Sequence, residues 1–508
     1  MRTSSITIIS LTALYNPWLT LQSQSAVTQR PNVLFVISDD QSYPHTSAYG
    51  SDFVKTPGFD FVAEHGWLFS NAFVTSPGSS PSRASILTGL YPWQIEEAGT
   101  HASSFPAKYT CFPDLLEAEG YKIGYTGKGW GPGDWKVSGR RRNPAGPVYN
   151  EKKTNPPYSG ISRIAYADNF KEFFAQKRDK QPFYFWVGGN EPHRPYEEGS
   201  WKSENKVLSN VIVPPYLPDQ EPIRGDLMDY AVEIEWFDNQ LNQILQFLKE
   251  QNELENTIII VMADNGMPFP AAKANCYEYG IHVPLTICWM QGIQQGGFSE
   301  EMISSVDLFP TIMEATGITT SQERVGHSLL PYMRRQQMDS GRKYVFAGRE
   351  RHSSARYSNW GYPMRAIRSK QFLYIRNYHP ERWPAGDPYF LRKDGTPSPM
   401  HKAYYDIDSG ASWTYIVDHK DTPELYPFFL KATAKRPYEE LYDIVNDPGC
   451  FYNLIGNKSY DSVHQSLSKE MDEMLQSTHD SRATDSSEDV WETYPRLSGA
   501  IRQFTKPL

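Results

Sequence analysis

The sequence predicts an α/β protein, in which a layered α/β domain is followed by a smaller antiparallel sheet. The first observation is a set of four short apolar runs, each leading into polar residues, at positions 32–38, 121–127, 183–189 and 257–263. Runs this apolar are typical of strands that are buried on both faces, as in a parallel sheet. The second is the helical pattern between the runs, and the third is a change of pattern after Arg342.

Helical segments precede two of the four runs. Residues 112–120 lead into the second run, and residues 226–252, which carry apolar side chains at helical spacing, lead into the fourth. Alternating strands and helices predict a layered sheet whose ligands bind beyond the carboxyl ends of the strands. All four polar ends belong to that edge, so we expect them to converge on one site.

From Arg342 onward, strand-like runs at 343–347 and 371–376 alternate with loops rich in Pro, Tyr and Gly, and a helical pattern returns at 460–476. This predicts a smaller antiparallel sheet with a terminal helix. We therefore divide the chain into a larger α/β domain at 30–340 and a C-terminal subdomain at 341–508.

Composition excludes several classes of protein. The chain has 508 residues with 39% hydrophobic and 14% aromatic content, which indicates a globular protein with a large core. A formal net charge of −9 argues against nucleic-acid binding. Four cysteines without a CxxC pair disfavour a metal–thiolate site, although Cys276 and Cys288 could form a disulfide.

Residues 1–27 resemble a signal peptide, because Arg2 is followed by an apolar run and then by the polar stretch from Gln22. The run falls short of the ~20 clean apolar residues of a membrane span, so we expect no stable span. Export to the bacterial periplasm or to the medium is the prediction, and a disordered N-terminus is the alternative.

The stretch from Ser76 to Tyr91 is the one around which the site is organised. Its first half is turn-prone and its second half, from Ser82, predicts a helix. Ser79 and Ser80 would then lie where backbone N–H groups and the helix dipole favour negative charge, with Arg83 within reach. This suggests chemistry on a tetrahedral oxyanion; the alternative is an N-capped helix with a surface arginine.

The ends of the first and fourth runs carry hard oxygen donors, namely Asp39, Asp40, Asp264 and Asn265. No histidine pair accompanies them, so zinc is disfavoured, Ca²⁺ is preferred and Mg²⁺ comes second. The alternative for an Asp-Asp pair is a turn or a helix cap.

The segment Ser79-Ser80-Pro81-Ser82-Arg83, continuing into Ala-Ser-Ile-Leu-Thr-Gly, resembles the signature of the formylglycine-dependent sulfatases of the serine type. The resemblance extends over about residues 32–331. It implies an alkaline-phosphatase-like α/β/α sandwich, and oxidation of Ser79 to Cα-formylglycine by a serine-type maturation enzyme. It also implies that Ser79 completes a calcium site with Asp39, Asp40, Asp264 and Asn265.

The same resemblance implies roles for four further residues. Arg83 and the metal activate the nucleophile, while Lys128 and Lys273 hold the sulfate oxygens. His193, in Glu191-Pro192-His193, protonates the leaving group. A solvated surface position for either lysine, and a histidine that only caps a strand edge, are the alternatives.

One position departs from the family pattern. Many sulfatases carry a histidine two residues after the lysine that Lys128 matches, and this chain has Trp130 there. Either another base, such as His45 or His101, replaces it, or the step that regenerates the nucleophile differs.

Segments 264–270, 350–352 and 362–365 look most like the heparan N-sulfatase branch of the family. By that resemblance the second domain reaches into the pocket and recognises the terminal sugar. The residues that we expect to contact the substrate are His352, Arg365, Arg351 and His101. Because related bacterial enzymes act on O-sulfated glycans, both N- and O-linked sulfate remain open.

The sequence therefore predicts an exported, calcium-dependent sulfatase that acts on a terminal sugar of a sulfated oligosaccharide. One rival is a phosphate or phosphonate ester hydrolase on the same scaffold. Another is a non-catalytic sulfated-glycan-binding protein in which Ser79 is never oxidised.

Overall fold

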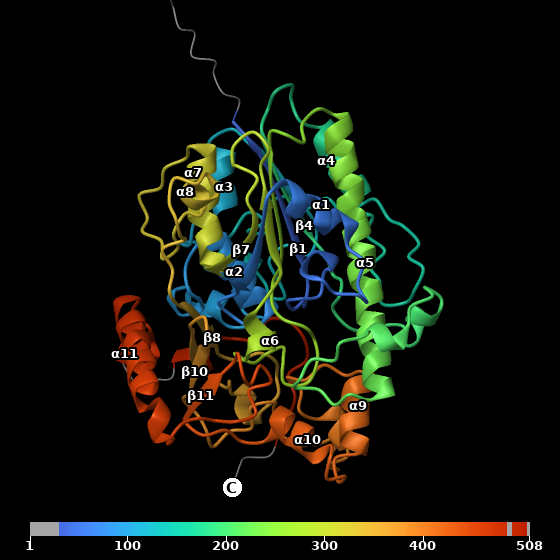
Figure 1. Cartoon of the computed structure of the whole chain (residues 1–508), viewed down its shortest axis with the longest axis vertical. Helices are drawn as coiled ribbons and strands as arrows, with labels where there is room; N and C mark the ends of the chain where they lie inside the picture. Colours follow the sequence, from blue (N-terminus) through green and yellow to red (C-terminus); the bar gives the residue numbers. More distant parts are fainter. Residues whose placement is uncertain (1–29, 485–489, 505–508) are drawn as a thin grey trace, which may run out of the picture.

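The computed structural model describes residues 30–484 and 490–504 and contains two β-sheets (Figure 1). The predicted signal peptide at 1–27 lies outside the described residues. None of the helices in the described part of the chain is both long enough and apolar enough to cross a membrane.

The larger sheet has seven strands in the order β3-β4-β1-β5-β6-β2-β7. The strands are β1 (Asn32–Ser38), β2 (Trp67–Phe73), β3 (Lys122–Gly127), β4 (Phe183–Gly188), β5 (Thr257–Ala263), β6 (Leu285–Cys288) and β7 (Gly297–Ser304). The four predicted runs are the neighbouring parallel strands β3, β4, β1 and β5. Because β6 runs antiparallel to both β5 and β2, the sheet is mixed and not parallel throughout.

Helices cover both faces of this sheet, so the unit has three layers (Figure 1). On one side lie α1 (Pro57–His65), α4 (Tyr166–Ala175) and α5 (Glu221–Glu250); on the other lie α2 (Ser79–Thr88), α3 (Phe112–Ala118), α7 (Leu308–Thr316) and α8 (Leu330–Met333). Strand β1 shows why both faces need cover, since Leu34 packs toward α1, α4 and α5 while Phe35 packs toward α2, α3 and α7. The predicted three-layer sandwich is therefore present.

The smaller sheet is antiparallel, in the order β11-β10-β9-β8, as the pattern after Arg342 predicts. Its strands are β8 (Val345–Arg349), β9 (Met364–Arg368), β10 (Phe372–Asn377) and β11 (Glu439–Asp443). The terminal helix α11 (Asp461–Ser477) packs on one face through Leu467, Met471 and Leu475. The remaining helices are α6 (Glu278–Ile281), α9 (Ala411–Asp418), α10 (Tyr426–Thr433), α12 (Ser481–Thr484) and α13 (Val490–Thr493).

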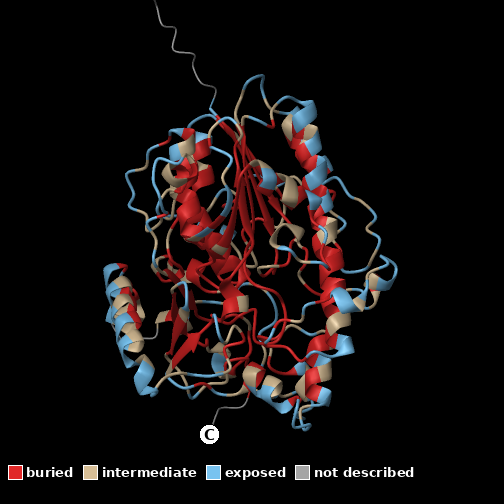
Figure 2. Ribbon diagram, viewed as in Figure 1, coloured by how far each residue is buried: buried red, intermediate tan, exposed pale blue. Residues whose placement is uncertain are grey.

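The other face of the smaller sheet joins the main core. Leu373 and Ile375 belong to the same buried cluster as Phe35 and Ile86 of the larger unit, and Figure 2 shows the buried region running from one sheet to the other. The division at residue 340 stays a prediction, but the shared core holds the second sheet against the first. All four cysteines are buried and free, so Cys276 and Cys288 are not paired.

Candidate active site

The carboxyl ends of β1 and β5 lie side by side because the two strands are paired in register up to Ser38 and Ala263. The next residues, Asp39 and Asp264, therefore leave the sheet at the same point. The backbone N–H of Asp40 donates to Asp264 Oδ1 at 3.1 Å, and Asp40 adopts a left-handed backbone (φ 69°) that turns its side chain back toward the cluster.

Three buried carboxylates meet here, from Asp39, Asp40 and Asp264, and their oxygens lie within 4.8 Å of one another. Asn265 adds its amide, which donates to Asp40 Oδ1 at 2.7 Å. Burial and the neighbouring Asp39 carboxylate raise the pKa of Asp264 to about 6. Burial alone would also raise the pKa of Asp39, but Lys128, His193 and Arg83 hold it well below its usual range. Such an oxygen cluster fits a hard divalent cation.

Helix α2 brings Ser79 to this cluster. The helix begins at Ser79, three residues before the predicted start at Ser82, with Gly78 as its N-cap. Ser79 Oγ lies 2.9 Å from Asp39 Oδ1 and 3.2 Å from Asn265 Oδ1. A side chain at position 78 would displace His352, because a Cβ there would lie 2.9 Å from its Nδ1. Ser79 therefore sits at a helix N-terminus beside the carboxylates.

Arg83 follows one turn later and is fully buried. Its Nε donates to Asp264 Oδ2 at 2.7 Å and its Nη1 to the backbone carbonyl of Lys128 at 2.7 Å. One guanidinium thus ties the start of α2 to the ends of β5 and β3. The alternative of a surface arginine is wrong.

Two lysines pair with neighbouring carboxylates of this cluster. Lys128 Nζ lies 2.6 Å from Asp39 Oδ2, and Lys273 Nζ lies 2.6 Å from Asp40 Oδ2. Burial opposes the charge on Lys273, but Asp40 and Asp408 outweigh it and raise the pKa of this ammonium above its ordinary value. Both lysines line the same cavity as Ser79.

His193 follows β4 at the same edge and is part-exposed. Its Nδ1 lies 2.6 Å from the carbonyl oxygen of Arg194, and a carbonyl can only accept, so Nδ1 carries a hydrogen. Its Nε2 lies 3.8 Å from Asp40 Oδ2. Nε2 is therefore the ring atom that would hand a proton to a group in the cavity.

A cavity of about 460 Å³ joins these residues. Its lining includes Asp39, Ser79, Lys128, His193 and Lys273 from the larger unit, and His352, Ser353, Tyr405 and Asp408 from the C-terminal part. Asp408, Tyr405 and Ser353 are lining residues that the sequence analysis missed. They lie in loops without a motif or a periodic pattern, so no signal in the sequence identified them.

His101 and His352, which we expect to contact the substrate, line the cavity, and their ring centroids lie 4.4 Å apart. Burial lowers the pKa of both imidazoles, that of His352 to about 3. At neutral pH they therefore present two uncharged rings to the cavity.

Two predicted substrate contacts are placed elsewhere. Arg365 is bound by Asp480 at 2.7 Å and Glu350 at 2.8 Å, and Arg351 donates to the backbone carbonyls of Tyr494 and Pro495. Neither side chain lines the cavity. The expectation that these two residues contact the substrate is corrected accordingly: each guanidinium is used inside the fold.

Trp130, which stands where many sulfatases have a histidine, and His45, one of the two bases proposed to replace that histidine, also lie outside the cavity. Trp130 is buried and donates its indole N–H to the Ser80 carbonyl at 3.0 Å. His45 is buried beside Tyr230, with its Nδ1 3.4 Å from the tyrosine hydroxyl. Of the two proposed substitute bases, only His101 reaches the cavity.

Arg194 also lines the cavity, but its charge is paired with Asp226. In the remaining ion-pair network of described residues beside Ser79, carboxylates outnumber permanent cations. Asp39, Asp40, Asp264 and Asp408 face Arg83, Lys128 and Lys273. Without a further positive charge such a site would repel an anion, whereas a divalent cation on the three clustered carboxylates would make it attractive.

Comparisons with known proteins point to one family. A family model described as Sulfatase matches residues 31–318, more than half of the chain. A second model, described as N-sulphoglucosamine sulphohydrolase, C-terminal, matches residues 272–412. An ulvan-active sulfatase of Formosa agariphila is 26% identical over 456 residues, which cover 89% of this chain and 81% of that protein. The N-sulphoglucosamine sulphohydrolase of Homo sapiens is 26% identical over 487 residues, covering 88% and 90%.

One solved structure, of a protein in complex with its substrate D-glucosamine-2-N,6-O-disulfate, matches with a TM-score of 0.65. It covers 90% of this chain and 100% of that one at 18% identity, a likeness that concerns the fold. The predicted fold class is confirmed by this match. With the family model spanning most of the larger unit and its C-terminal companion continuing into the smaller one, the chain belongs to the sulfatase family, with homology to the N-sulphoglucosamine sulphohydrolases.

Proposed function

We propose that this sulfatase hydrolyses a sulfate ester or a sulfamate on the terminal sugar of a sulfated glycan, with formylglycine at position 79 and Ca²⁺ beside it. One observation carries the proposal. Ser79 Oγ lies at the meeting point of an oxygen-lined cluster, Asp39, Asp264 and Asn265, and of two ammonium groups, in one cavity. This arrangement suits a nucleophile that attacks an anionic sulfur group.

The cation would be held by Asp39, Asp40, Asp264 and Asn265, whose oxygens are the hard ligands that Ca²⁺ prefers. When bound, Ca²⁺ supplies positive charge that lowers the pKa of the attacking hydroxyl. The hydrated formylglycine supplies two hydroxyls, one to attack sulfur and one to release sulfate as the carbonyl re-forms.

The chain's own residues do the remaining work. Lys128 and Lys273 are placed to hold the non-bridging sulfate oxygens, where negative charge must be accommodated in the transition state. As the bond from sulfur to the leaving oxygen or nitrogen breaks, its electron pair stays on the leaving atom, which takes a proton from Nε2 of His193. Arg83 keeps the start of α2 in place against Asp264.

The substrate class follows from the relatives and from the C-terminal wall of the cavity. One relative is named for ulvan and another for N-sulphoglucosamine, so we include both O-linked and N-linked sulfate among the groups that this chain could hydrolyse. His352 and Tyr405 of the second unit line the cavity together with residues of the larger unit, and this added wall favours a terminal sugar. A serine-type maturation enzyme would act on the chain, and export would follow from the N-terminal segment.

The test has two arms. Mass spectrometry of the Ser79 peptide, from protein produced with a serine-type maturation enzyme, should show the loss of two hydrogens. The same protein should release sulfate in a screen of defined N- and O-sulfated saccharides. Release of phosphate from aryl phosphate at rates above those on aryl sulfate would instead support a phosphate ester hydrolase. An unmodified Ser79, with binding but no release, would support a glycan-binding protein.

A further inference from the structure

Asp408 brings a carboxylate into the active-site cavity from the C-terminal part of the chain. Its Oδ2 lies 2.9 Å from Lys273 Nζ. A carboxylate oxygen of Asp408, one of Asp40 and a ring nitrogen of His193 all lie within 4.8 Å of one another. Burial would raise the pKa of Asp408, but Lys273 and His193 lower it to about 2, so the group is ionised.

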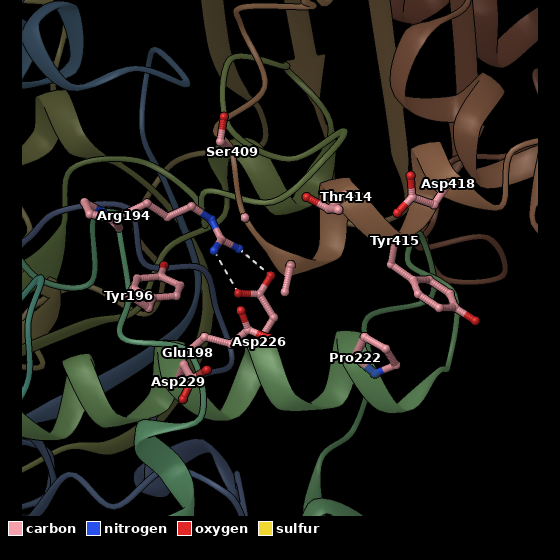
Figure 3. A pocket seen from close by; sticks show the side chains of 13 residues that line it. Arg194, Tyr196, Glu198, Pro222, Asp226, Asp229, Ser409, Thr414, Tyr415 and Asp418 are labelled. Carbon is pink, nitrogen blue, oxygen red and sulfur yellow. Dashed lines mark hydrogen bonds and ion pairs between the residues drawn. The ribbon is translucent and has the colours of Figure 1, made fainter. Parts of the chain in front are cut away.

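The position of Asp408 is fixed by a clamp next to His193. Arg194 donates two hydrogen bonds, of 2.8 and 2.7 Å, to the carboxylate of Asp226 on α5, and this pair faces the segment that carries Ser409 (Figure 3). The backbone N–H of Ser412 donates to the same carboxylate at 3.0 Å. Gly410 packs so closely on Arg194 that a Cβ would lie 2.2 Å from its Nη1.

One clamp therefore sets the distance between two cavity groups. His193 precedes Arg194 in the chain, and Asp408 lies two residues before Gly410. His193 and Asp408 both line the active-site cavity, whereas Ser409 and Gly410 line a second cavity (Figure 3), and Arg194 lines both.

A carboxylate here needs a reason, because the cavity has to accept an anion. Holding Lys273 is an insufficient reason, since Asp40 already lies 2.6 Å from the same ammonium. An ionised carboxylate only accepts hydrogen bonds, and it repels a nearby anion. It fits a substrate group that donates a hydrogen bond and carries no negative charge.

Building on the proposed function, we propose that Asp408 determines substrate specificity. It accepts a hydrogen bond from a hydroxyl or amine on the ring carbon next to the sulfated one, and it excludes a second sulfate there. His193 marks the leaving atom, and a carboxylate oxygen of Asp408 lies within 4.8 Å of a ring nitrogen of His193. The two side chains are therefore close enough to contact neighbouring substituents of one sugar ring. The substrate class is therefore a sugar that carries an unsulfated hydroxyl or amine on the ring carbon next to the one that bears the scissile sulfate.

The experiment uses the saccharide that the desulfation screen identifies, together with the same sugar carrying a second sulfate on the neighbouring carbon. Matured wild-type enzyme should favour the singly sulfated sugar in kcat/KM by at least about 10-fold, because a buried acceptor rejects a group that cannot donate to it. In Asp408→Asn, whose amide has the same shape without the charge, this ratio should fall at least about 10-fold. Asp418→Asn removes an exposed carboxylate outside the cavity and should leave the ratio unchanged.

Three results would overturn the inference: equal use of both sugars by the wild type, an unchanged ratio in Asp408→Asn, or equal losses on both sugars in that variant. The last result would mean that Asp408 only positions Lys273. If matured protein releases sulfate from no compound, the proposed function fails. Calorimetric titration of the two glucosamine sugars, the N-sulfate and the N,3-O-disulfate, into the unmodified chain then decides this inference. A weaker Kd for the disulfate supports it, and equal or absent binding contradicts it.

Discussion

Trp130 donates its indole N–H to the backbone carbonyl of Ser80 over 3.0 Å. Many other sulfatases have a histidine at the position of Trp130. In this chain the tryptophan instead holds the first turn of α2, at the residue after Ser79. Trp130 is 3% exposed and does not line the cavity. Besides His193, the imidazoles that line the cavity with Ser79 belong to His101 and His352, which are far apart in the chain.

Trp130→Phe should lower the free energy of unfolding by about 1 kcal/mol beyond the loss of packing, because the Ser80 carbonyl loses its donor. Denaturant unfolding of the unmodified chain measures the change. The matched control is Trp413→Phe, since Trp413 is only 2% exposed and its indole N–H has no hydrogen-bond partner among the described residues. Equal losses in the two variants would contradict the role given to the Trp130 bond.

Ca²⁺ should raise the melting temperature of the chain, and a chelator should reverse the effect. A ligand that binds only the folded state stabilises it by about 2.7 kcal/mol at a hundredfold excess over Kd. Ca²⁺ should act more strongly than Mg²⁺. Asp264→Asn should abolish the response, while Asp219→Asn, on the surface, should keep it. A response that survives in Asp264→Asn would place the cation elsewhere.

Asp226→Asn should destabilise the chain by about 3 to 5 kcal/mol, because the Arg194 guanidinium would be left buried without its counter-charge. The control is Asp219→Asn, which breaks a similar two-bond pair with Arg224 where Asp219 is 59% exposed. This surface loss should be at most about 1 kcal/mol. Thermal unfolding of both variants measures the difference, and losses of the same size would show that the clamp adds little.

The buried strands and their polar ends could be predicted from the sequence because each is marked by residues that are adjacent in the chain. An apolar run marks a strand covered on both faces, and the first residues after β1 and β5 have to emerge at one edge when the strands are parallel. The start of α2 was predicted three residues late, because Ser79 and Ser80 read equally well as loop or first turn until Gly78 is seen to cap the helix.

Long-range partners set the limit of prediction. Arg365 was expected to contact the substrate, but it pairs with Asp480. Asp480 lies 115 residues later in the chain, and no motif in the sequence links the two residues. Asp408 lies 135 residues from Lys273, in a loop whose path depends on the Arg194–Asp226 clamp. Strand β6 has only four residues, and β7 begins in exposed positions and carries Glu300 and Glu301 at its centre, so neither had the apolar signal of its neighbours.

Acid should destabilise the chain partly through His45. Burial lowers the pKa of its imidazole to about 4, against about 6.5 in the unfolded chain. The unfolded state therefore binds an extra proton between these values, so stability present above pH 6.5 is lost as the pH falls toward 4. At pH 5 the loss is about 2 kcal/mol.

Measuring the free energy of unfolding at pH 7 and pH 5 tests this. His45→Gln should reduce the difference between the two values by about 2 kcal/mol, and His419→Gln, at an exposed site, should leave it unchanged. An unchanged difference in His45→Gln would show that the ring is hydrated or already charged in the folded state.

His193→Ala should impair the enzyme in proportion to how poor the leaving group is. A sugar oxygen leaves badly without a proton, so kcat on a sugar sulfate should fall about 10²- to 10⁴-fold when the acid is removed. A nitrophenolate leaves well without one, so the loss on 4-nitrophenyl sulfate should be much smaller. His464→Ala, which removes a ring paired with Glu439 in the C-terminal unit, controls for general effects and should change neither rate. Because Nδ1 of His193 is committed to the Arg194 carbonyl, the difference between the two substrates reports on Nε2. Equal losses on both would assign His193 to holding Asp40 and not to proton transfer.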